Sequence, residues 1–334
     1  MSMLKTHTAG SFYMIKYFHM EEAIKSFNEQ FLFDPVIVNG EKLTNHKNIV
    51  LAGMGGSHLA AGIIKSYKPG IDIYVHRAYD LPPYDDEFLK DSLLIASSYS
   101  GNTEEVISFL DEGLAKGYQM AVISTGGALI EKAKEFNLPH IEIPDTGIQP
   151  RSALGYSTIA LAKFIKDDEI LRELKNIKLD PEEFRSSGEE LARGLENKIP
   201  IIYSSTDNLG IAYNWKIKMN ETGKIPAFYN IFPEMNHNEI VGFDNVELSK
   251  NFKFIILKDR DDHKMVQKRM EVFEKIFEEK GLEVIKLELE GENTFEKIFK
   301  SLLLADWTAL SVAKIYGSDP EKVPTIEKFK SLIK

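Results

Sequence analysis

The sequence predicts an α/β protein of two domains, each a parallel five-stranded sheet with helices on both faces. Three observations predict this fold. The chain has 334 residues, and a usual domain has about 100–200. Short apolar runs alternate with helical patterns, as is typical of parallel sheets buried on both faces. Turns rich in Gly, Ser and Thr follow three of the runs, at the edge where such sheets bind ligands.

The first domain is expected over residues 20–166. Apolar residues at helical spacing predict an N-terminal helix over 17–31. The runs that follow predict strands at 48–52, 71–76, 93–97, 120–124 and 140–143. Helical patterns between them predict helices at 59–67, 104–116 and 128–136.

The second domain is expected over residues 198–317, after a helical connector at 167–197 that is rich in Glu and Lys. Its apolar runs predict strands at 200–203, 226–231, 252–257 and 282–289. Helical patterns predict helices at 209–219, 263–279 and 294–315. A break at the GSDP sequence of 317–320 predicts a separate tail helix within 318–334.

The composition is that of a soluble globular protein, with 43% hydrophobic and 28% charged residues. The net charge of -10 argues against a nucleic-acid partner, which needs clustered Lys and Arg. The absence of cysteine excludes disulfides and thiolate metal sites within the sequence. No apolar run approaches the roughly 18 residues that span a bilayer, and residues 1–10 lack the core of a signal peptide. We therefore expect no membrane partner and a cytoplasmic location.

The turn after the predicted strand at 93–97 has the composition of a phosphate site. Ser98, Ser100 and Thr103 supply three hydroxyls, and Gly101 lets the backbone curl so that amide groups point inward. A helix follows directly, and its positive N-terminal end favours an anion. The alternative is an ordinary helix cap, with Thr103 capping the helix in a serine-rich loop. Three hydroxyls plus glycine, directly after an apolar strand, favour phosphate binding.

The turn at 53–57, with sequence GMGGS, begins like a dinucleotide fingerprint. That fingerprint needs a further glycine where this chain has His58, and an acidic residue where the second strand ends at His76 and Arg77. A dinucleotide-dependent dehydrogenase is therefore disfavoured, and no P-loop sequence occurs. A tight strand-to-helix turn without a ligand is the structural alternative for this segment.

Two motifs, GMGGS at 53–57 and SYSGNTEE at 98–105, resemble the SIS (sugar isomerase) domain, a Rossmann-like fold. Three further segments resemble one branch of it, the bifunctional phosphoglucose/phosphomannose isomerase family: QPRSALGY at 149–156, NE at 220–221 and PEMNHNE at 233–239. The resemblance extends from about residue 53 to the C-terminus. It implies that Gly55, Gly56 and Ser57 bind the substrate phosphate together with Ser98, Ser100 and Thr103.

The resemblance also implies residues for the chemistry, which moves a proton between neighbouring sugar carbons through an enediol. Glu221, at the end of the predicted helix 209–219 and before Gly223 as a natural helix stop, corresponds to the base. Without the resemblance it would be an ordinary surface glutamate. Arg151 corresponds to an active-site arginine that stabilises negative charge on the enediol oxygens; the alternative is an interdomain salt bridge.

His237 corresponds to the family residue that opens the sugar ring and that the neighbouring subunit supplies. Its near-neutral titration suits proton transfer, although a lone histidine is more often structural. This implies a homodimer with shared active sites. Glu234 and Glu239 lie in the same segment and receive no role.

The C-terminal sequence IEKFK at 326–330 resembles the closing motif of the family, with Phe329 in place of Leu. Lys330 would then reach the active site. Thr325 lies near the place of a small threonine to which the family's acceptance of mannose 6-phosphate is tied.

No cofactor or metal is expected, because the histidines are scattered without the spacing of metal ligands. The leading hypothesis is a metal-independent isomerase that interconverts glucose 6-phosphate, mannose 6-phosphate and fructose 6-phosphate, with a sugar phosphate as its small-molecule partner. One alternative is a non-catalytic sugar-phosphate sensor, which would have no use for Glu221, Arg151 and His237 together. A second alternative is another SIS phosphosugar isomerase with the same phosphate site.

Overall fold

The computed structural model describes residues 19–333 and divides the chain into two compact units, each with its own parallel sheet. The N-terminal unit comprises Phe27–Leu179 and Glu292–Ile298. The C-terminal unit comprises Asp180–Gly291 with residues 19–26 and 299–333 of those described. The chain passes from one unit to the other inside 167–197, the segment expected to connect the domains. The boundaries 20–166, 198–317 and 318–334 stay predictions.

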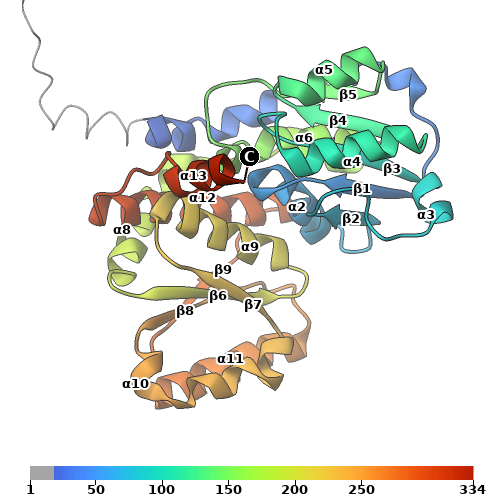
Figure 1. Cartoon of the computed structure of the whole chain (residues 1–334). Coiled ribbons are helices and arrows are strands. Elements are labelled where there is room, and N and C mark those ends of the chain that lie inside the picture. Colours follow the sequence, from blue (N-terminus) through green and yellow to red (C-terminus); the bar gives the residue numbers. More distant parts are fainter. Residues whose placement is uncertain (1–18, 334) are drawn as a thin grey trace, which may run out of the picture. The chain divides into compact units, whose positions relative to one another are not determined.

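The sheet of the N-terminal unit has five parallel strands in the order β2-β1-β3-β4-β5 (Figure 1). They are β1 (Asn48–Ala52), β2 (Ile73–His76), β3 (Ser92–Ser97), β4 (Met120–Ser124) and β5 (His140–Glu142). Because β1 lies between β2 and β3, the direction of strand addition reverses there. The turns after β1 and β3 therefore meet at a switch point, where open α/β sheets bind ligands. The predicted parallel fold is confirmed in this unit.

Helices cover both faces of this sheet because the central strands β1, β3 and β4 bury both of their faces. The helices of the unit are α2 (Leu59–Tyr67), α3 (Asp86–Lys90), α4 (Glu104–Ala115), α5 (Gly127–Glu135), α6 (Leu154–Ile165) and α7 (Asp168–Lys175). Alternate strand residues such as Val50 and Leu94 pack with Phe109 of α4 and Leu129 of α5. Helix α6 was not predicted from the sequence, because it is apolar nearly all round and therefore gives a weak amphipathic signal.

The sheet of the C-terminal unit has four parallel strands among the described residues, in the order β7-β6-β8-β9. They are β6 (Ile199–Ser205), β7 (Phe228–Phe232), β8 (Phe252–Lys258) and β9 (Val284–Glu288). The expected fifth strand is absent from this part of the chain. After β9 the chain instead enters α12 (Thr294–Ile315), a helix of 22 residues. The residues between α12 and α13 (Pro324–Leu332) are mostly polar or turn-forming and provide no apolar run for a strand.

The remaining helices of the C-terminal unit are α8 (Arg185–Gly194), α9 (Leu209–Lys218), α10 (Val246–Ser249) and α11 (Lys264–Glu279). Figure 1 shows α9 on one face of the sheet and α11 on the other. The α11 face is built from aromatic rings: Tyr203 and Phe254 of the strands pack against Phe273 and Phe277. This core fixes the sheet from which α9 and its C-terminal end are positioned.

The predicted N-terminal helix is shorter than expected. Residues 19–25 are helical, and a separate 3-10 helix follows at Phe27–Leu32. The division between the two units falls between Ser26 and Phe27, so one continuous helix over 17–31 does not form. Residues 17 and 18 lie outside the described part. Across residues 19–333, every helix is too short or too polar to span a membrane.

Candidate functional site

The turn after β3 brings the hydroxyl groups of Ser98 and Thr103 together. The Ser98 Oγ lies 2.7 Å from the Thr103 Oγ1, and Ser98 is only 1% exposed. Thr103 occupies the N-cap position of α4, but its side chain makes no capping hydrogen bond. The expectation that this hydroxyl caps the helix is therefore wrong, because it faces Ser98 instead. The first N–H groups of α4 receive no cap from this residue, which suits a helix end that accepts an anion.

Ser100 lies at the exposed rim of the same turn, where its hydroxyl accepts a hydrogen bond from the Asn102 backbone N–H at 3.4 Å. The Asn102 side chain donates to the Ser100 carbonyl at 3.0 Å. It also accepts from the backbone N–H of Ala128, in the first turn of α5, at 3.1 Å. The rim is thus tied to the neighbouring turn.

Glycines let the turns after β3 and β4 touch. Gly101 has a φ of +70°, and a Cβ there would lie 1.8 Å from the carbonyl oxygen of Gly126. Gly127 has a φ of +64°, and its Cβ would lie 2.5 Å from the Ser100 carbonyl oxygen. Both positions therefore require glycine for conformation and for space.

The turn after β1 is joined to the turn after β3 through Ser57. The Ser57 Oγ accepts a hydrogen bond from the Tyr99 backbone N–H at 2.9 Å. Its carbonyl accepts from the Ser97 hydroxyl, also at 2.9 Å. Gly55, at a φ of +53°, begins the 3-10 helix Gly55–His58 that leads into α2. As the Ser57 oxygen already accepts, its hydroxyl hydrogen is available to donate to a ligand.

Arg151 belongs to the same unit and approaches the turn after β1. It lies in the 3-10 helix Pro150–Ser152, whose backbone packs against Gly56. The arginine is only 2% exposed, and its Nη1 donates to the Gln149 Oε1 at 3.5 Å. A buried guanidinium is suited to stabilising negative charge. The structure thus brings the backbones of Gly56 and Arg151 together, Ser98 against Thr103, and Ser57 against the turn after β3.

The corresponding turn of the second sheet, after β8, has opposite chemistry. Asp259 and Asp262 are buried there, and both carboxylates accept from the Asn208 Nδ2, at 3.4 Å and 3.3 Å. Burial raises the pKa of Asp262 above its ordinary value, and the nearby Asp259 charge raises it further. Buried carboxyl groups give a phosphate no favourable partner. Of these two corresponding turns, the hydroxyl-lined turn of the first sheet is the one whose chemistry suits a phosphate.

Glu221 lies in the C-terminal unit, within a π-helix at Met219–Gly223 that continues α9. Its side chain is partly exposed. The helical segment ends at Gly223, as expected, and the next residue, Lys224, adopts the left-handed conformation with a φ of +59°. Single π turns inside α-helices occur frequently at functional sites. The backbone around Glu221 is therefore unusual in a way that suits the role predicted for it.

His237 ends the 3-10 helix Glu234–His237 and is exposed. Nearby, the Glu239 carboxylate accepts hydrogen bonds from the Tyr203 hydroxyl at 2.6 Å and from the Asn230 amide. Glu234 accepts from the Asn238 amide at 2.8 Å. The Glu239 contacts hold the segment on β6 and β7, and the Glu234 contact lies within the segment itself.

Lys330 and Thr325 lie on α13, where both side chains are exposed. Helix α13 buries none of its residues. The roles that the resemblance implies for Lys330 and Thr325 stay predictions.

A buried ion pair in the C-terminal unit was not predicted from the sequence. The Lys218 Nζ lies 2.6 Å from the Asp306 Oδ1, directly before the π-helix. The sequence contains a signal for this pair, because Lys218 ends a largely buried helix and Asp306 interrupts a long apolar one. Charged groups in such positions are rarely buried unless they are paired.

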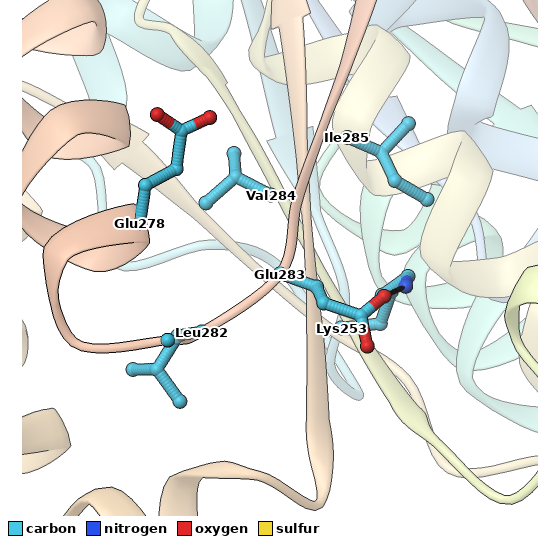
Figure 2. A pocket seen from close by; sticks show the side chains of 7 residues that line it. Lys253, Glu278, Leu282, Glu283, Val284 and Ile285 are labelled. Carbon is cyan, nitrogen blue, oxygen red and sulfur yellow. Dashed lines mark hydrogen bonds and ion pairs between the residues drawn. The ribbon is translucent and has the colours of Figure 1, made fainter.

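A surface pocket of about 420 Å³ lies on the β8–β9 side of the C-terminal unit. Figure 2 shows the Glu283 carboxylate turned to the Lys253 ammonium, with Glu278 on the end of α11 across the pocket. None of the predicted site residues lines it. Within residues 19–333, no cluster of three or more His, Asp or Glu side chains could hold a metal ion.

Solved structures of sugar-phosphate proteins share this fold. The glucosamine-6-phosphate deaminase of Thermotoga maritima matches with a TM-score of 0.65 at 17% identity, over 93% of this chain and 97% of its own. The C-terminal domain of the Francisella tularensis glucosamine-fructose-6-phosphate aminotransferase matches with a TM-score of 0.66 at 18% identity, over 96% and 100%. The two parallel sheets and the hydroxyl-lined turns thus define an α/β protein of the SIS type.

Sequence relatives narrow this class. Residues 184–333 match the bacterial phospho-glucose isomerase C-terminal SIS domain. The bifunctional phosphoglucose/phosphomannose isomerase of Aquifex aeolicus is 35% identical, over 94% of this chain and 99% of its own. The protein of the same name from Caldicellulosiruptor bescii is 36% identical, over 85% and 88%. The chain belongs to the bifunctional phosphoglucose/phosphomannose isomerase family, which confirms the predicted resemblance.

Proposed function

We propose that this protein interconverts glucose 6-phosphate, mannose 6-phosphate and fructose 6-phosphate through an enediol. The observation that supports this most directly is the hydroxyl-lined site of Ser57, Ser98 and Thr103, in a chain that aligns with bifunctional isomerases over nearly its whole length. A sugar phosphate would be held there by hydroxyls and by the N–H groups that begin α4.

Isomerisation requires that a proton leave one carbon and return to its neighbour. In the proposal, Glu221 takes the proton from C2 of the open-chain aldose and returns it to C1, giving the ketose. Arg151 stabilises the negative charge that develops on the enediol oxygens. Glucose and mannose 6-phosphates differ only in configuration at C2, so one enediol serves both.

His237 opens the sugar ring by proton transfer to the ring oxygen, and it acts at the site of the neighbouring subunit of a homodimer. Lys330 belongs to the same catalytic set. The reaction needs neither metal nor cofactor, and the protein works in the cytoplasm. The exposure of His237 is compatible with a role at another subunit.

A coupled assay tests this proposal. Purified protein is given glucose 6-phosphate or mannose 6-phosphate, and fructose 6-phosphate is followed with and without a metal chelator. We expect turnover of both sugars, unchanged by chelator. Failure on both sugars would refute the isomerase assignment, and loss of turnover on chelation would refute metal independence alone.

A second sugar-phosphate reaction serves as the comparison. The D-glucosamine-6-phosphate 4-epimerase of Sulfolobus acidocaldarius is 27% identical over 222 residues, covering 65% of this chain and 70% of its own. Glucosamine 6-phosphate is therefore the informative alternative substrate. Conversion of this amino sugar without activity on the two hexose phosphates would favour that reaction instead.

A further inference from the structure

Helix α9 changes its hydrogen-bonding pattern at a buried charge. Lys218 is the last α-helical residue, and the π-helix with Glu221 begins at the next residue. The Lys218 Nζ lies 2.6 Å from the Asp306 Oδ1 on α12, with side-chain exposures of 1% and 6%. An ion pair buried this deeply is costly to break, because removal of one partner takes away an opposite charge that stabilises the other where water is excluded.

The far end of the π-helix contacts the same face of α12. A Cβ at Gly223 would lie 3.4 Å from the Val312 Cγ1 and 3.5 Å from the Ala309 carbonyl oxygen. Asp306, Ala309 and Val312 are spaced by three residues and therefore lie along one face of the helix. The backbone of Glu221 is thus bracketed by two contacts to α12, one ionic and one by close packing.

Bonds within the turn hold its irregular shape. The Met219 carbonyl accepts from the Lys224 backbone N–H and, at 3.3 Å, from that of Ile225. The Lys224 ammonium donates to the Glu221 carbonyl. The Asn220 side-chain amide donates to the Ile225 carbonyl at 2.9 Å. A π turn is less favourable than continued α-helix, and such geometry persists where its surroundings over-determine it.

We propose that Lys218 and Asp306 are positioning residues that hold the π-helix Met219–Gly223 and thereby aim the Glu221 carboxylate. This inference depends on the proposed function only for the role of Glu221. The pair fixes the start of the π-helix, so that Glu221 is presented in one direction. Small misplacements of a catalytic group cost much of its effect.

The test uses Asp306→Asn and the apolar double variant Lys218→Met with Asp306→Leu. Asp306→Asn removes the carboxylate charge that lies 2.6 Å from the buried Lys218 ammonium. The double variant removes both charges and keeps apolar volume, so that stability should largely return. For both variants we expect kcat to fall about 10- to 100-fold while KM stays within about 2-fold. The orientation of the Glu221 carboxylate is lost, whereas phosphate binding is retained. Hydrogen exchange at the Lys224 and Ile225 amides should accelerate about 10-fold or more, while that of β6 stays unchanged.

Ser301→Ala is the matched control. The Ser301 hydroxyl accepts from the Trp215 Nε1 at 2.9 Å and so joins the same two helices, α9 and α12, before the π-helix begins. We expect its kcat to match that of the unchanged protein. Lys253→Met, which breaks the ion pair of Figure 2, controls for general destabilisation of the unit.

The outcomes separate this inference from the proposed function. Recovery of kcat together with stability in the double variant would show that the pair is only structural. Unchanged exchange at Lys224 and Ile225 would overturn the inference even if the protein proved inactive on both sugars. Full turnover of Glu221→Gln, with accelerated exchange in Asp306→Asn, would remove Glu221 as the base and leave the pair as a support of the π-helix.

Discussion

The backbone nitrogen of Arg151 lies 2.8 Å from the position that a Cβ on Gly56 would occupy. The Pro150 carbonyl carbon lies 2.7 Å from the same position. A single methyl group at Gly56 would therefore push the arginine loop away from the turn after β1. Glycine is required here because two backbones approach each other, which links a predicted phosphate turn to a predicted catalytic arginine.

For Gly56→Ala we expect kcat/KM to fall about 10-fold or more, because Arg151 is displaced from the enediol oxygens. Steady-state kinetics with fructose 6-phosphate measures the change. Gly70→Ala is the control, since a Cβ there meets nothing within 4 Å. Equal kcat/KM values for the two variants would show that the position of Arg151 does not affect catalysis.

Removal of the paired hydroxyls tests the phosphate site. For Ser98→Ala and Thr103→Val we expect KM for the sugar phosphate to rise about 10-fold each, as a buried hydrogen bond to a charged group is lost. Competition by inorganic phosphate should weaken in parallel. Ser108→Ala is the matched control on α4, where the Ser108 hydroxyl donates to the Asp80 Oδ1 at 2.5 Å. An unchanged KM in both site variants would argue against phosphate binding in this turn.

Glu221→Gln separates the proton transfer from binding. We expect kcat to fall about 10²- to 10⁴-fold with KM nearly unchanged, which is the usual contribution of a general base. Exchange of the C2 proton of glucose 6-phosphate with deuterated water, followed by NMR, should stop. Glu247→Gln is an exposed control, where Glu247 pairs with the surface Lys250. Continued exchange in the Glu221 variant would assign the base elsewhere.

Mixed dimers test whether subunits share their sites. Glu221→Gln and His237→Ala chains, each nearly inactive on the cyclic sugar, are unfolded together and refolded. If His237 serves the neighbouring subunit, one site of each mixed dimer is intact, and about a quarter of the full activity should return. No recovery, with mixed dimers shown by mass spectrometry, would place both residues in the same subunit's site or make His237 structural.

The buried side chain of His58 should make the stability of the folded protein depend on pH in the acid range. Burial, together with the Arg77 charge, lowers the pKa of His58 from 6.5 to about 4. Between about pH 6.5 and 4, His58 therefore binds a proton in the unfolded chain but stays neutral in the folded chain. The free energy of unfolding should fall as the pH drops through this range. His58→Gln should flatten this dependence by up to about 3 kcal/mol, measured by urea unfolding. A slope unchanged in His58→Gln contradicts the assignment.

Much of the fold followed from the sequence because local rules and tertiary packing agree. Asn48–Ala52, Met120–Ser124, Leu59–Tyr67 and Thr294–Ile315 have the predicted bounds. Apolar runs buried on both faces, bounded by turn residues, leave few alternatives. The prediction of a fifth strand in the second sheet was wrong, because the sequence after β9 contains no further apolar run that forms a strand. Helix α6 was missed because burial all round removes the amphipathic period.

The sequence by itself determined the parallel α/β plan, the hydroxyl-rich turn and the family resemblance. Each of these depends on local patterns and motifs formed by residues close together along the chain. Only the tertiary structure decided that Thr103 faces Ser98 rather than capping its helix, and that Gly56 touches the Arg151 backbone. It also placed Glu221 in a π-helix beside the Lys218–Asp306 pair. These relations join residues 5, 95 and 88 positions apart along the chain or depend on the end of a packed helix. Side-chain direction and long-range pairing are set by what each group meets in the folded protein, which local sequence does not encode.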